Sequence, residues 1–305
     1  MDYLYRMNES QGEPAGHRAG FVSILGRPNV GKSTLMNRLV GEKLSIITPK
    51  AQTTRHRILG ILNGSDFQIV YSDTPGILRP EYALHKSMMG SVRLSLEDAD
   101  LLLFVADPFE RYGEEDIIAQ IALSKVPKIL VLNKIDLCNA EKADGAIDYW
   151  SNIIKPAGKL GISALDGTGL DTLISMVLEY MPEHPPFYPK DALTDRPERF
   201  FASEILREKI FGLYKKEIPY SCEVEVIEFS ESEDIIRIRT IIYVERSSQR
   251  AILLGHKGER IKRTGIEART DMEAFFGKKV FLEQHIKVMP NWRRDARRLR
   301  QFGYN

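Results

Sequence analysis

Residues 26–33 read GRPNVGKS, and the segments on either side of this stretch decide the fold. The apolar run FVSIL at 21–25 comes directly before it, and an amphipathic stretch at 33–39 follows. The order is strand, loop and helix, and the loop fits the pattern GxxxxGK(S/T), whose glycines let backbone N–H groups wrap around phosphates. Lys32 would neutralise β- and γ-phosphate oxygens, and the Ser33 hydroxyl would bind Mg²⁺. The stretch predicts a nucleoside triphosphate site without separating ATP from GTP.

Apolar runs and helical patterns alternate after this loop. Runs typical of buried strands lie at 101–106, 128–132 and 159–162, and helical patterns fill the intervals at 82–96, 113–124, 141–154 and 169–180. This alternation predicts an α/β domain with a mostly parallel sheet and helices on both faces. Residues 57–62 and 67–71 flank the turn signal Asn63-Gly64-Ser65, so we expect a hairpin that adds one antiparallel strand.

Asp73-Thr74-Pro75-Gly76 follows the second strand of this hairpin. A carboxylate at the end of that strand would lie opposite the phosphate loop, where it can hold Mg²⁺ through a water molecule. Gly76 would offer a backbone N–H to the γ-phosphate and a hinge that responds to its loss.

A polar loop at residues 43–57, KLSIITPKAQTTRHR, lies between these two motifs, and we call it the switch loop. At this position such a loop must supply a hydroxyl that closes on Mg²⁺ when the γ-phosphate is present. We assign this role to Thr54, with Thr53 as the alternative.

The base is indicated by Asn133-Lys134-Ile135-Asp136, which follows the strand at 128–132. The Asp136 carboxylate can accept hydrogen bonds from N1–H and the 2-amino group of guanine, whereas adenine would leave it unpaired at a cost of about 1–3 kcal/mol. Asn133 would hold the loop, and the stem of Lys134 would cover the base. Ser163-Ala164-Leu165 follows the last strand and would reach the guanine carbonyl through backbone N–H groups. The predicted nucleotide is therefore GTP.

These assignments give a predicted nucleotide site that comprises Gly26, Arg27, Pro28, Asn29, Val30, Gly31, Lys32, Ser33, Thr34, Asp73, Thr74, Pro75, Gly76, Asn133, Lys134, Asp136, Ser163, Ala164 and Leu165. The predicted catalytic residues are Lys32, Thr54 and Gly76, and the predicted Mg²⁺ ligands are Ser33, Thr54 and, through water, Asp73.

The order and spacing of the motifs resemble the translation-factor-like class of GTPases, with a departure at position 77. Ile77 stands where Ras-like proteins carry a water-orienting glutamine, and an aliphatic side chain cannot orient water by hydrogen bonding. Several bacterial GTPases that lack this glutamine use an asparagine matching Asn29 to bind K⁺ beside the phosphates. The resemblance therefore implies a K⁺ ion that neutralises charge developing between the phosphates.

Residues 181–189, MPEHPPFYP, hold four prolines and predict an extended linker that ends the first domain. Beyond the linker the charge changes. Residues 1–196 carry a net charge of −4, and residues 246–305 carry 15 Lys and Arg against 6 Asp and Glu. This basic end indicates a polyanionic partner, with a solubilising tail as the alternative.

A second motif, Gly255-His256-Lys257-Gly258, lies between two helical patterns in this basic region. A GxxG loop at a helix N-terminus clamps the nucleic-acid backbone in KH modules. The predicted order is a helix at 198–215, strands at 222–229 and 235–244, a helix near 249–254, GxxG, a helix at 259–275 and a strand at 280–288. This order matches the type II KH arrangement.

Basic side chains around the loop would form the electrostatic footprint for RNA. A terminal basic helix, 292–300, adds five arginines and Trp292, which could stack on a base; a solvated helix is the alternative. The predicted RNA contacts are Gly255, His256, Lys257, Gly258, Arg260, Lys262, Arg263, Lys287, Trp292 and Arg293.

The whole pattern resembles the Era family of bacterial GTPases. The resemblance is carried by residues 50–58, 199–209, 220–221 and 244–267. It implies a GTP-regulated factor in assembly of the small (30S) ribosomal subunit, whose KH domain binds the 3′ end region of 16S rRNA. It also implies peripheral association with the cell membrane. An RNA-binding scaffold with a near-vestigial GTPase, or a GTPase acting on a protein or membrane partner, remain the alternatives.

The expected layout is a flexible tail at 1–19, a GTPase domain at 20–181, a linker at 182–197, a KH domain at 198–290 and a basic end at 291–305. No apolar run is long enough to span a bilayer, and no signal pattern opens the chain. Cys138 and Cys222 lack metal-ligand spacing, so we expect free thiols in a reducing cytoplasm and no structural zinc. We also expect a monomer.

Overall fold

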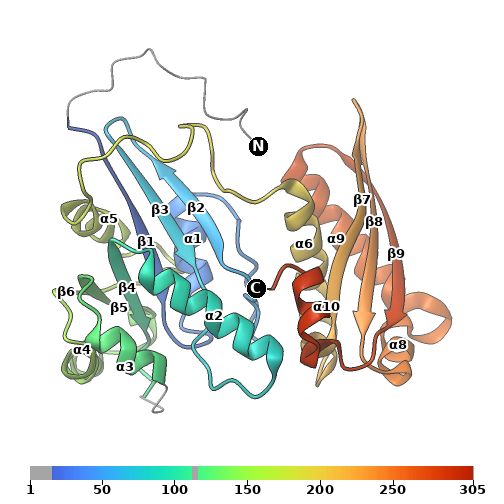
Figure 1. The fold of residues 1–305 in the computed structure, drawn as a ribbon, viewed down its shortest axis with the longest axis horizontal. Helices are drawn as coiled ribbons and strands as arrows, with labels where there is room; N and C mark the ends of the chain where they lie inside the picture. The colour runs from blue at the N-terminus through green and yellow to red at the C-terminus, as the bar shows by residue number, and fades with distance from the viewer. Residues whose placement is uncertain (1–15, 112–115, 305) are drawn as a thin grey trace.

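The computed structural model describes residues 16–111 and 116–304, and its larger sheet has the strand order β2-β3-β1-β4-β5-β6 (Figure 1). The strands are β1 (Arg18–Leu25), β2 (Ile58–Asn63), β3 (Phe67–Asp73), β4 (Leu101–Ala106), β5 (Lys128–Leu132) and β6 (Gly158–Gly161). β2 pairs antiparallel with β3, and every other pair is parallel. The prediction of a mostly parallel sheet with one antiparallel strand is confirmed.

Helices cover both faces of this sheet because its strands are apolar on both sides. The helices are α1 (Lys32–Val40), α2 (Ala83–Glu97), α3 (Asp116–Leu123), η1 (Ile135–Leu137), α4 (Ala140–Ile154) and α5 (Leu170–Glu179). In β4, Leu101 and Leu103 pack in a core with α1 and α5, whereas Leu102 and Phe104 pack in a second core with α2, α3 and α4. Successive side chains of a strand point to opposite faces, so a continuous apolar run feeds two cores.

The parallel strands end at one edge of the sheet, and the predicted nucleotide motifs follow these ends. β1 ends at Leu25 and leads into the GRPNVGKS loop, β3 ends at Asp73, and β5 ends at Leu132 beside Asn133. Loops that come from different strands meet at this edge, which is the usual ligand position in open α/β sheets.

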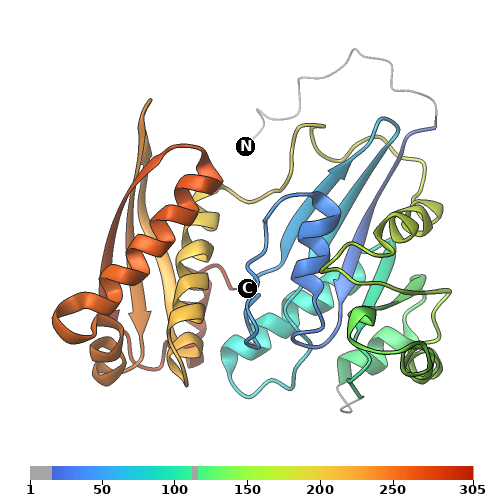
Figure 2. The ribbon, with the colours of Figure 1, turned by 180° about the vertical axis from the view of Figure 1, so that it is seen from behind.

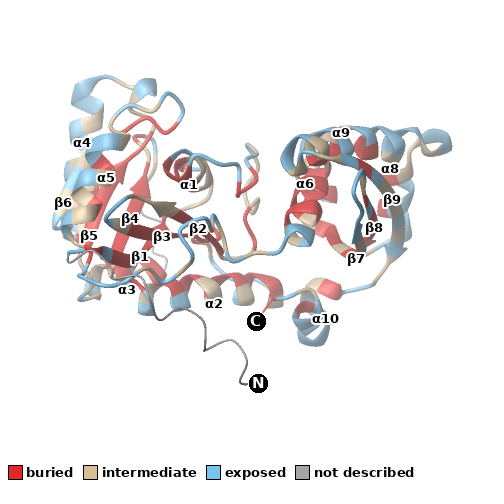
Figure 3. Ribbon diagram, turned by 90° about the horizontal axis from the view of Figure 1, so that it is seen from above, coloured by how far each residue is buried: buried red, intermediate tan, exposed pale blue. Residues whose placement is uncertain are grey.

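The smaller sheet has the order β7-β8-β9, with α6, α8 and α9 on one face (Figures 1 and 3). Its elements are α6 (Glu198–Leu213), α7 (Ile218–Ser221), β7 (Glu223–Glu231), β8 (Ile235–Val244), α8 (Ser247–Leu254), η2 (His256–Gly258), α9 (Glu259–Phe276) and β9 (Lys279–Val288). β8 pairs antiparallel with β7 and parallel with β9. Figure 2 shows α6 and α9 side by side in front of the sheet, over a core of their own. The predicted KH fold is confirmed, with the short helix α7 as an element that the sequence pattern did not reveal.

The proline-rich segment between the two sheets packs against the first one. Ile61 N donates to Leu193 O at 2.9 Å, and Thr194 Oγ1 donates to Leu59 O at 2.7 Å. Gln68 accepts from the N–H groups of residues 187 and 188. The segment is extended, as expected, but it is fastened along the β2 edge.

Two expectations about the chain ends need correction. β1 begins at Arg18, so residues 18 and 19 belong to the sheet and not to a tail; residues 1–15 lie outside the described part, as do 112–115 of the expected helix at 113–124. The expected single helix at 292–300 is instead η3 (Trp292–Arg294) followed by α10 (Ala296–Gln301). Asp295 separates them because its side chain caps α10 by accepting from Arg297 N and Arg298 N.

Among the described residues, no helix combines the length and the apolar character that crossing a bilayer requires.

Candidate nucleotide site and nucleic-acid interface

The phosphate loop takes the backbone shape that its glycines allow. Gly31 lies at the N-cap of α1 with φ 97°, and a Cβ there would be 2.2 Å from Nδ2 of Asn133. Lys32 arches back over the loop and donates from Nζ to Arg27 O at 2.8 Å. Burial lowers the pKa of this ammonium to about 8, against the opposing effect of Asp73 and Glu110. An anionic phosphate beside it would favour the charged form.

Three hard oxygen donors converge at the start of α1. Ser33 Oγ lies 2.9 Å from Thr54 Oγ1 and donates to Asp73 Oδ2 at 2.7 Å, and Thr54 Oγ1 donates to the same carboxylate oxygen at 3.5 Å. Asp73 is fully buried, and its Oδ1 has no hydrogen-bond partner among the described residues. Hydroxyl and carboxylate oxygens are the ligands that Mg²⁺ takes beside phosphates, so these residues fit the ion.

The alternative residue, Thr53, has different hydrogen-bond partners. Its Oγ1 is 2.6 Å from Thr48 Oγ1 and donates to Lys50 O at 2.7 Å, which braces the switch loop internally. Of the two threonines, the structure places Thr54 with Ser33 and Asp73.

The segment after β3 comes close to the phosphate loop. A Cβ on Gly76 would lie 2.7 Å from Pro28 Cγ, so only glycine allows this approach. Thr74 donates from Oγ1 to Ile24 O at 2.8 Å, and with Pro75 it is buried behind the loop. Ile77 is 1% exposed and packs in the core under α2, and its N donates to Gly26 O at 3.0 Å. Position 77 therefore holds the loop in place and does not face the site.

Asn133 joins the phosphate loop to the loop after β6. Its Nδ2 donates to Val30 O at 2.8 Å, and its Oδ1 accepts from Ala164 N at 2.9 Å. Ser163 N donates to Thr168 O at 3.1 Å. Two of the three N–H groups expected to reach guanine are thus engaged within the protein, and the side chain of Leu165 is 71% exposed.

The base end also includes a residue that the motif search missed. Lys134 Nζ donates to Asn29 O at 2.6 Å and to Asp107 Oδ2 at 3.0 Å, so its stem lies across the end of the site. Asp107 follows β4 directly, a position that the strand pattern could have pointed to. Asp136 is exposed in η1, two residues after Lys134.

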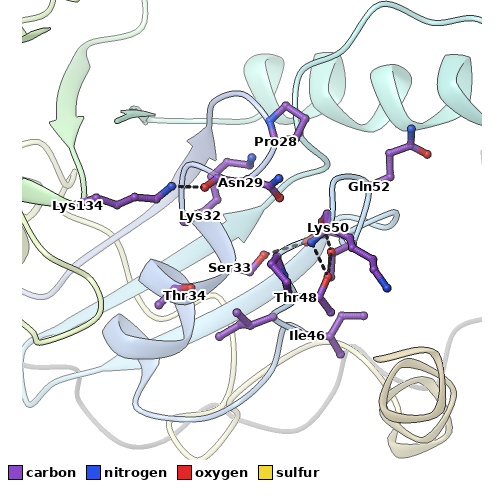
Figure 4. A pocket seen from close by; sticks show the side chains of 16 residues that line it. Pro28, Asn29, Lys32, Ser33, Thr34, Ile46, Thr48, Lys50, Gln52 and Lys134 are labelled. Atoms are coloured by element: carbon purple, nitrogen blue, oxygen red, sulfur yellow. Dashed lines mark hydrogen bonds between the residues drawn. The ribbon is translucent and has the colours of Figure 1, made fainter. Parts of the chain in front are cut away.

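Part of the predicted site lines a cavity of about 470 Å³, within the usual range for ligand pockets, whereas Asp73, Asn133 and Asp136 are not among the lining residues. Lys134 lies at one end and Gln52 at the other (Figure 4). The lining includes Pro28, Asn29, Gly31, Lys32, Ser33, Thr34, Thr54 and Gly76 of the predicted site, and Ile46, Ile47, Thr48, Pro49, Lys50 and Gln52 of the switch loop. Val30 instead packs in the core. The sequence analysis named only Thr54 and Thr53 of this loop, and Thr53 lines the cavity too, so the loop as a whole forms one wall of the cavity.

Two basic residues fasten the switch loop to the second domain. Lys50 Nζ donates to Phe211 O and to Tyr214 O, which lie at the carboxyl end of α6. Arg55 is 1% exposed. It donates to Pro219 O within α7, and to Cys222 O and Glu223 Oε2 directly after this helix. Positive groups are favoured at helix carboxyl ends because free carbonyls collect there. Thr54, at the Mg²⁺ donors, lies between these two anchors.

The GxxG loop lies between α8 and α9, with φ 69° at Gly255 and 80° at Gly258. His256 and Lys257 between them are exposed, as are Arg260, Lys262 and Arg263. A cavity of about 340 Å³ lies nearby and is lined by Arg250, Leu254, Ile261, Gln284, His285, Ile286 and Lys287. Of these, the sequence analysis had named only Lys287. A Cβ on Gly265 would lie 1.9 Å from Gln284 Nε2, so that glycine makes room for the amide in the groove.

The predicted stacking role of Trp292 is wrong, and Arg293, also predicted as an RNA contact, has partners within the protein. Trp292 is fully buried, donates from Nε1 to Ser221 O at 3.0 Å and packs in the core under α2. Arg293 pairs with Glu245, and its guanidinium lies 5.1 Å from the ring centre of Tyr82. Both residues join the C-terminal segment to the first domain, because an indole buries more apolar surface there than it could on a solvated helix.

Two protein-family models match the chain. A model described as "50S ribosome-binding GTPase" matches residues 21–134, and a KH domain model matches residues 217–293. Among curated relatives, "GTPase Era" of Syntrophus aciditrophicus (strain SB) is 45% identical, over 94% of this chain and 95% of its own. The chloroplastic GTPase ERA1 of Zea mays is 43% identical, over 95% of this chain and 71% of its own.

Two solved structures resemble the chain along nearly its whole length. A variant of Aquifex aeolicus Era bound to GDP·AlF₄⁻ has a TM-score of 0.89 and 40% identity, covering 94% of this chain and 99% of its own. An Era structure in complex with MgGDPNP and nucleotides 1506–1542 of 16S rRNA has a TM-score of 0.88 with the same identity and coverage. The similarity therefore spans both sheets and the segment that joins them.

Proposed function

The chain belongs to the Era family of GTPases, and from this premise we propose that bound GTP sets how its KH domain holds rRNA. It is a GTP-hydrolysing enzyme with an RNA-binding KH domain. The observation that carries the proposal is the switch loop, in which Thr54 lies with Ser33 and Asp73 while Lys50 and Arg55 are bound to the KH domain.

At the phosphates, we assign a separate task to each residue that would hold the phosphate groups or Mg²⁺. Lys32 holds the β- and γ-phosphate oxygens, and the N–H groups of the phosphate loop and of Gly76 complete the cradle. Ser33 and Thr54 hold Mg²⁺ directly, and Asp73 holds it through water. When bound, the ion neutralises charge on the phosphate oxygens. Thr54 can take this position only while the switch loop is closed.

Guanine is selected at the Lys134 end of the cavity. Asp136 accepts from N1–H and the 2-amino group, and Lys134, held by Asp107, covers the base. Asn133 keeps the phosphate loop and the loop after β6 together through Val30 and Ala164. We propose that K⁺ binds beside Asn29, whose side chain lines the cavity on the phosphate side of Lys134 (Figure 4).

RNA is bound along the GxxG loop and in the groove that α8, α9 and β9 line beside it. The neighbouring Era structure holds nucleotides 1506–1542 of 16S rRNA, and we propose that this chain binds the same 3′ end region during assembly of the 30S subunit. His256 and Lys257 are exposed on the loop, and Arg250 and Lys287 line the groove, so positive charge surrounds the path of an RNA backbone.

Nucleotide and RNA communicate through the two anchors of the switch loop. Loss of the γ-phosphate releases Thr54, and the switch loop then changes conformation. Because Lys50 and Arg55 are bound at the carboxyl ends of α6 and α7, this change alters the contacts of the loop with the KH domain. A ligand shifts a conformational equilibrium only if it binds the two states differently, and the effect is reciprocal. We therefore propose that the GTP form binds RNA more tightly and that RNA in turn favours GTP over GDP.

The test of the proposed RNA site replaces a glycine at each end of α9. Gly258→Asp puts a negative charge in the clamp and should abolish binding to an oligonucleotide of the 16S 3′ end, while intrinsic GTP hydrolysis continues. Gly277→Asp is the matched control, because Gly277 also has positive φ, 68°, and no atom within 4 Å of a Cβ. Equal RNA affinities of the two variants would refute the assigned site.

The location of the protein in the cell and its oligomeric state are proposed from the family. We propose a cytoplasmic monomer with a domain boundary within 182–197 and a peripheral contact with the membrane. Flotation of the purified protein with anionic vesicles, with and without RNA, tests the membrane contact.

A further inference from the structure

GTP hydrolysis at this site needs a group that orients water, and position 77 cannot supply it. Ile77 is apolar, 1% exposed and packed in the core under α2. We propose that Gln52 of the switch loop is the catalytic residue that orients the attacking water. This assignment rests on the proposed function of the cavity as the site of GTP hydrolysis.

Gln52 lines the nucleotide cavity at the end where the γ-phosphate would lie. The base end is marked by Lys134 and the β- and γ-phosphate position by Lys32, and Gln52 lies across the cavity from Lys134 (Figure 4). Thr54 and Gly76, which the proposed function places at Mg²⁺ and the γ-phosphate, line the same cavity. A water in line with the bond to be broken would stand on this side of the γ-phosphate.

The backbone of Gln52 is held in a conformation that side chains rarely adopt. Its φ is 61°, in the left-handed region. Lys50, two residues before it, is bound to the end of α6, and Arg55, three residues after it, is buried beside α7. Strained backbone of this kind persists where the surroundings determine it, and it gathers at functional sites.

The carboxamide of Gln52 has unused hydrogen-bonding capacity. Its Oε1 is buried and has no hydrogen-bond partner among the described residues. A buried acceptor without a partner calls for an explanation in terms of function. An amide can accept from water through Oε1 and donate to a phosphate oxygen through Nε2, which are the two contacts needed to orient water against a γ-phosphate.

In the proposed step, the water oxygen forms a bond to the γ-phosphorus. The bond between this phosphorus and the β–γ bridging oxygen breaks, and its electron pair leaves with GDP. The proton released by the water passes to the inorganic phosphate or to solvent. Gln52 stays neutral throughout, because an amide positions the water and does not act as its base.

Two substitutions separate the side chain from the backbone. Gln52→Met keeps the length of the side chain and removes both hydrogen-bonding groups. Gln52→Gly relieves the left-handed backbone and also removes the amide. Each variant is compared with the unaltered full chain in single-turnover GTP hydrolysis, in GDPNP affinity and in GDP affinity in the presence of AlF₄⁻.

We expect both variants to hydrolyse GTP about 10² to 10³ times more slowly, the usual cost of one such contact. Affinity for GDPNP should change less than about threefold, whereas AlF₄⁻-dependent GDP binding should fall with the rate, since the contact forms only in the transition state. Hydrolysis by Gln52→Met or Gln52→Gly within about threefold of the unaltered chain would overturn the assignment, as would an equal loss of GDPNP affinity. An unaltered chain that does not hydrolyse GTP would instead refute the proposed function.

Discussion

Arg55 of the switch loop donates from Nη1 to Glu223 Oε2 at 2.9 Å, and both side chains are almost fully buried. Tyr304 donates to the same carboxylate oxygen at 2.7 Å and stacks on His56 with 4.2 Å between ring centres. One buried carboxylate thus binds a residue of the switch loop and the last described residue of the chain. The nucleotide domain and the KH domain share this cluster as a structural unit.

Removal of Arg55 should cost stability because it leaves Glu223 buried without its cation. For Arg55→Met we expect the free energy of unfolding to fall by about 3–5 kcal/mol. Arg57→Met is the control from the same loop, since Arg57 pairs at 2.8 Å with Asp98, whose side chain is 55% exposed, and donates to Ser72 Oγ. Its removal leaves no buried charge without a partner, so the loss should be smaller. Urea titrations that gave equal losses for the two variants would contradict the anchoring role.

Asp136→Asn should exchange the base preference. An asparagine presents a donor where guanine also presents donors, so GTP affinity should fall by about 10- to 100-fold, whereas xanthosine triphosphate should gain affinity. Asp144→Asn on α4, also exposed, is the control and should leave both affinities unchanged. Competition titrations with the two nucleotides give the answer, and a retained preference for GTP would rule out Asp136 as the base-reading residue.

Hydrolysis should depend on the monovalent cation if K⁺ binds beside Asn29. We expect a rate at least about tenfold higher in K⁺ than in Na⁺ at equal ionic strength, because a fixed positive charge stabilises the developing negative charge. Asn29→Ala should reduce this ratio. The K⁺ proposal fails if the two salts support the same rate.

Acid should lower the free energy of unfolding through protonation of His56. Burial lowers the pKa of His56 to about 3, with Glu204 opposing and Arg207, Arg196 and Arg55 adding to the effect. The pKa of His56 in the folded protein lies below the ordinary 6.5, so the unfolded chain binds a proton first as the pH falls. The folded state therefore has its full stability above pH 6.5 and loses stability as the pH falls towards 3. By pH 5.5 the loss should be about 1 kcal/mol.

The measurement for His56 is the difference between unfolding free energies at pH 7.5 and pH 5.5. His56→Asn should show a smaller difference, since asparagine does not titrate. If the variant and the unaltered chain lose the same stability on acidification, the buried neutral state of His56 is not its cause.

Residues that belong to a local motif could be placed from the sequence. Lys32, Asp73 and Asp136 occur in fixed patterns at strand ends, and a parallel sheet brings such ends together. The choice of Thr54 over Thr53 followed from position alone, and the structure places Thr54 at the predicted metal donors.

Residues whose role depends on contacts between distant segments could not be read in this way. Trp292 looks like a stacking residue among arginines, yet it is buried because α2 and Ser221 come to it from elsewhere in the chain. Arg55 and Gln52 belong to a polar loop with no periodicity. The ends of α6 and α7 and the walls of the cavity give these side chains their surroundings, and they are visible only in three dimensions.

If GTP and rRNA binding are coupled, each ligand changes the affinity of the protein for the other. One comparison of affinities tests this coupling most directly. The dissociation constant for an oligonucleotide of the 16S 3′ end is measured with the GDPNP-loaded and the GDP-loaded full chain at one salt concentration. We predict tighter binding by the GDPNP form, within the 5- to 150-fold range typical of coupled sites, and the same factor for the effect of RNA on GDPNP affinity. Equal RNA affinities of the two forms would contradict the account.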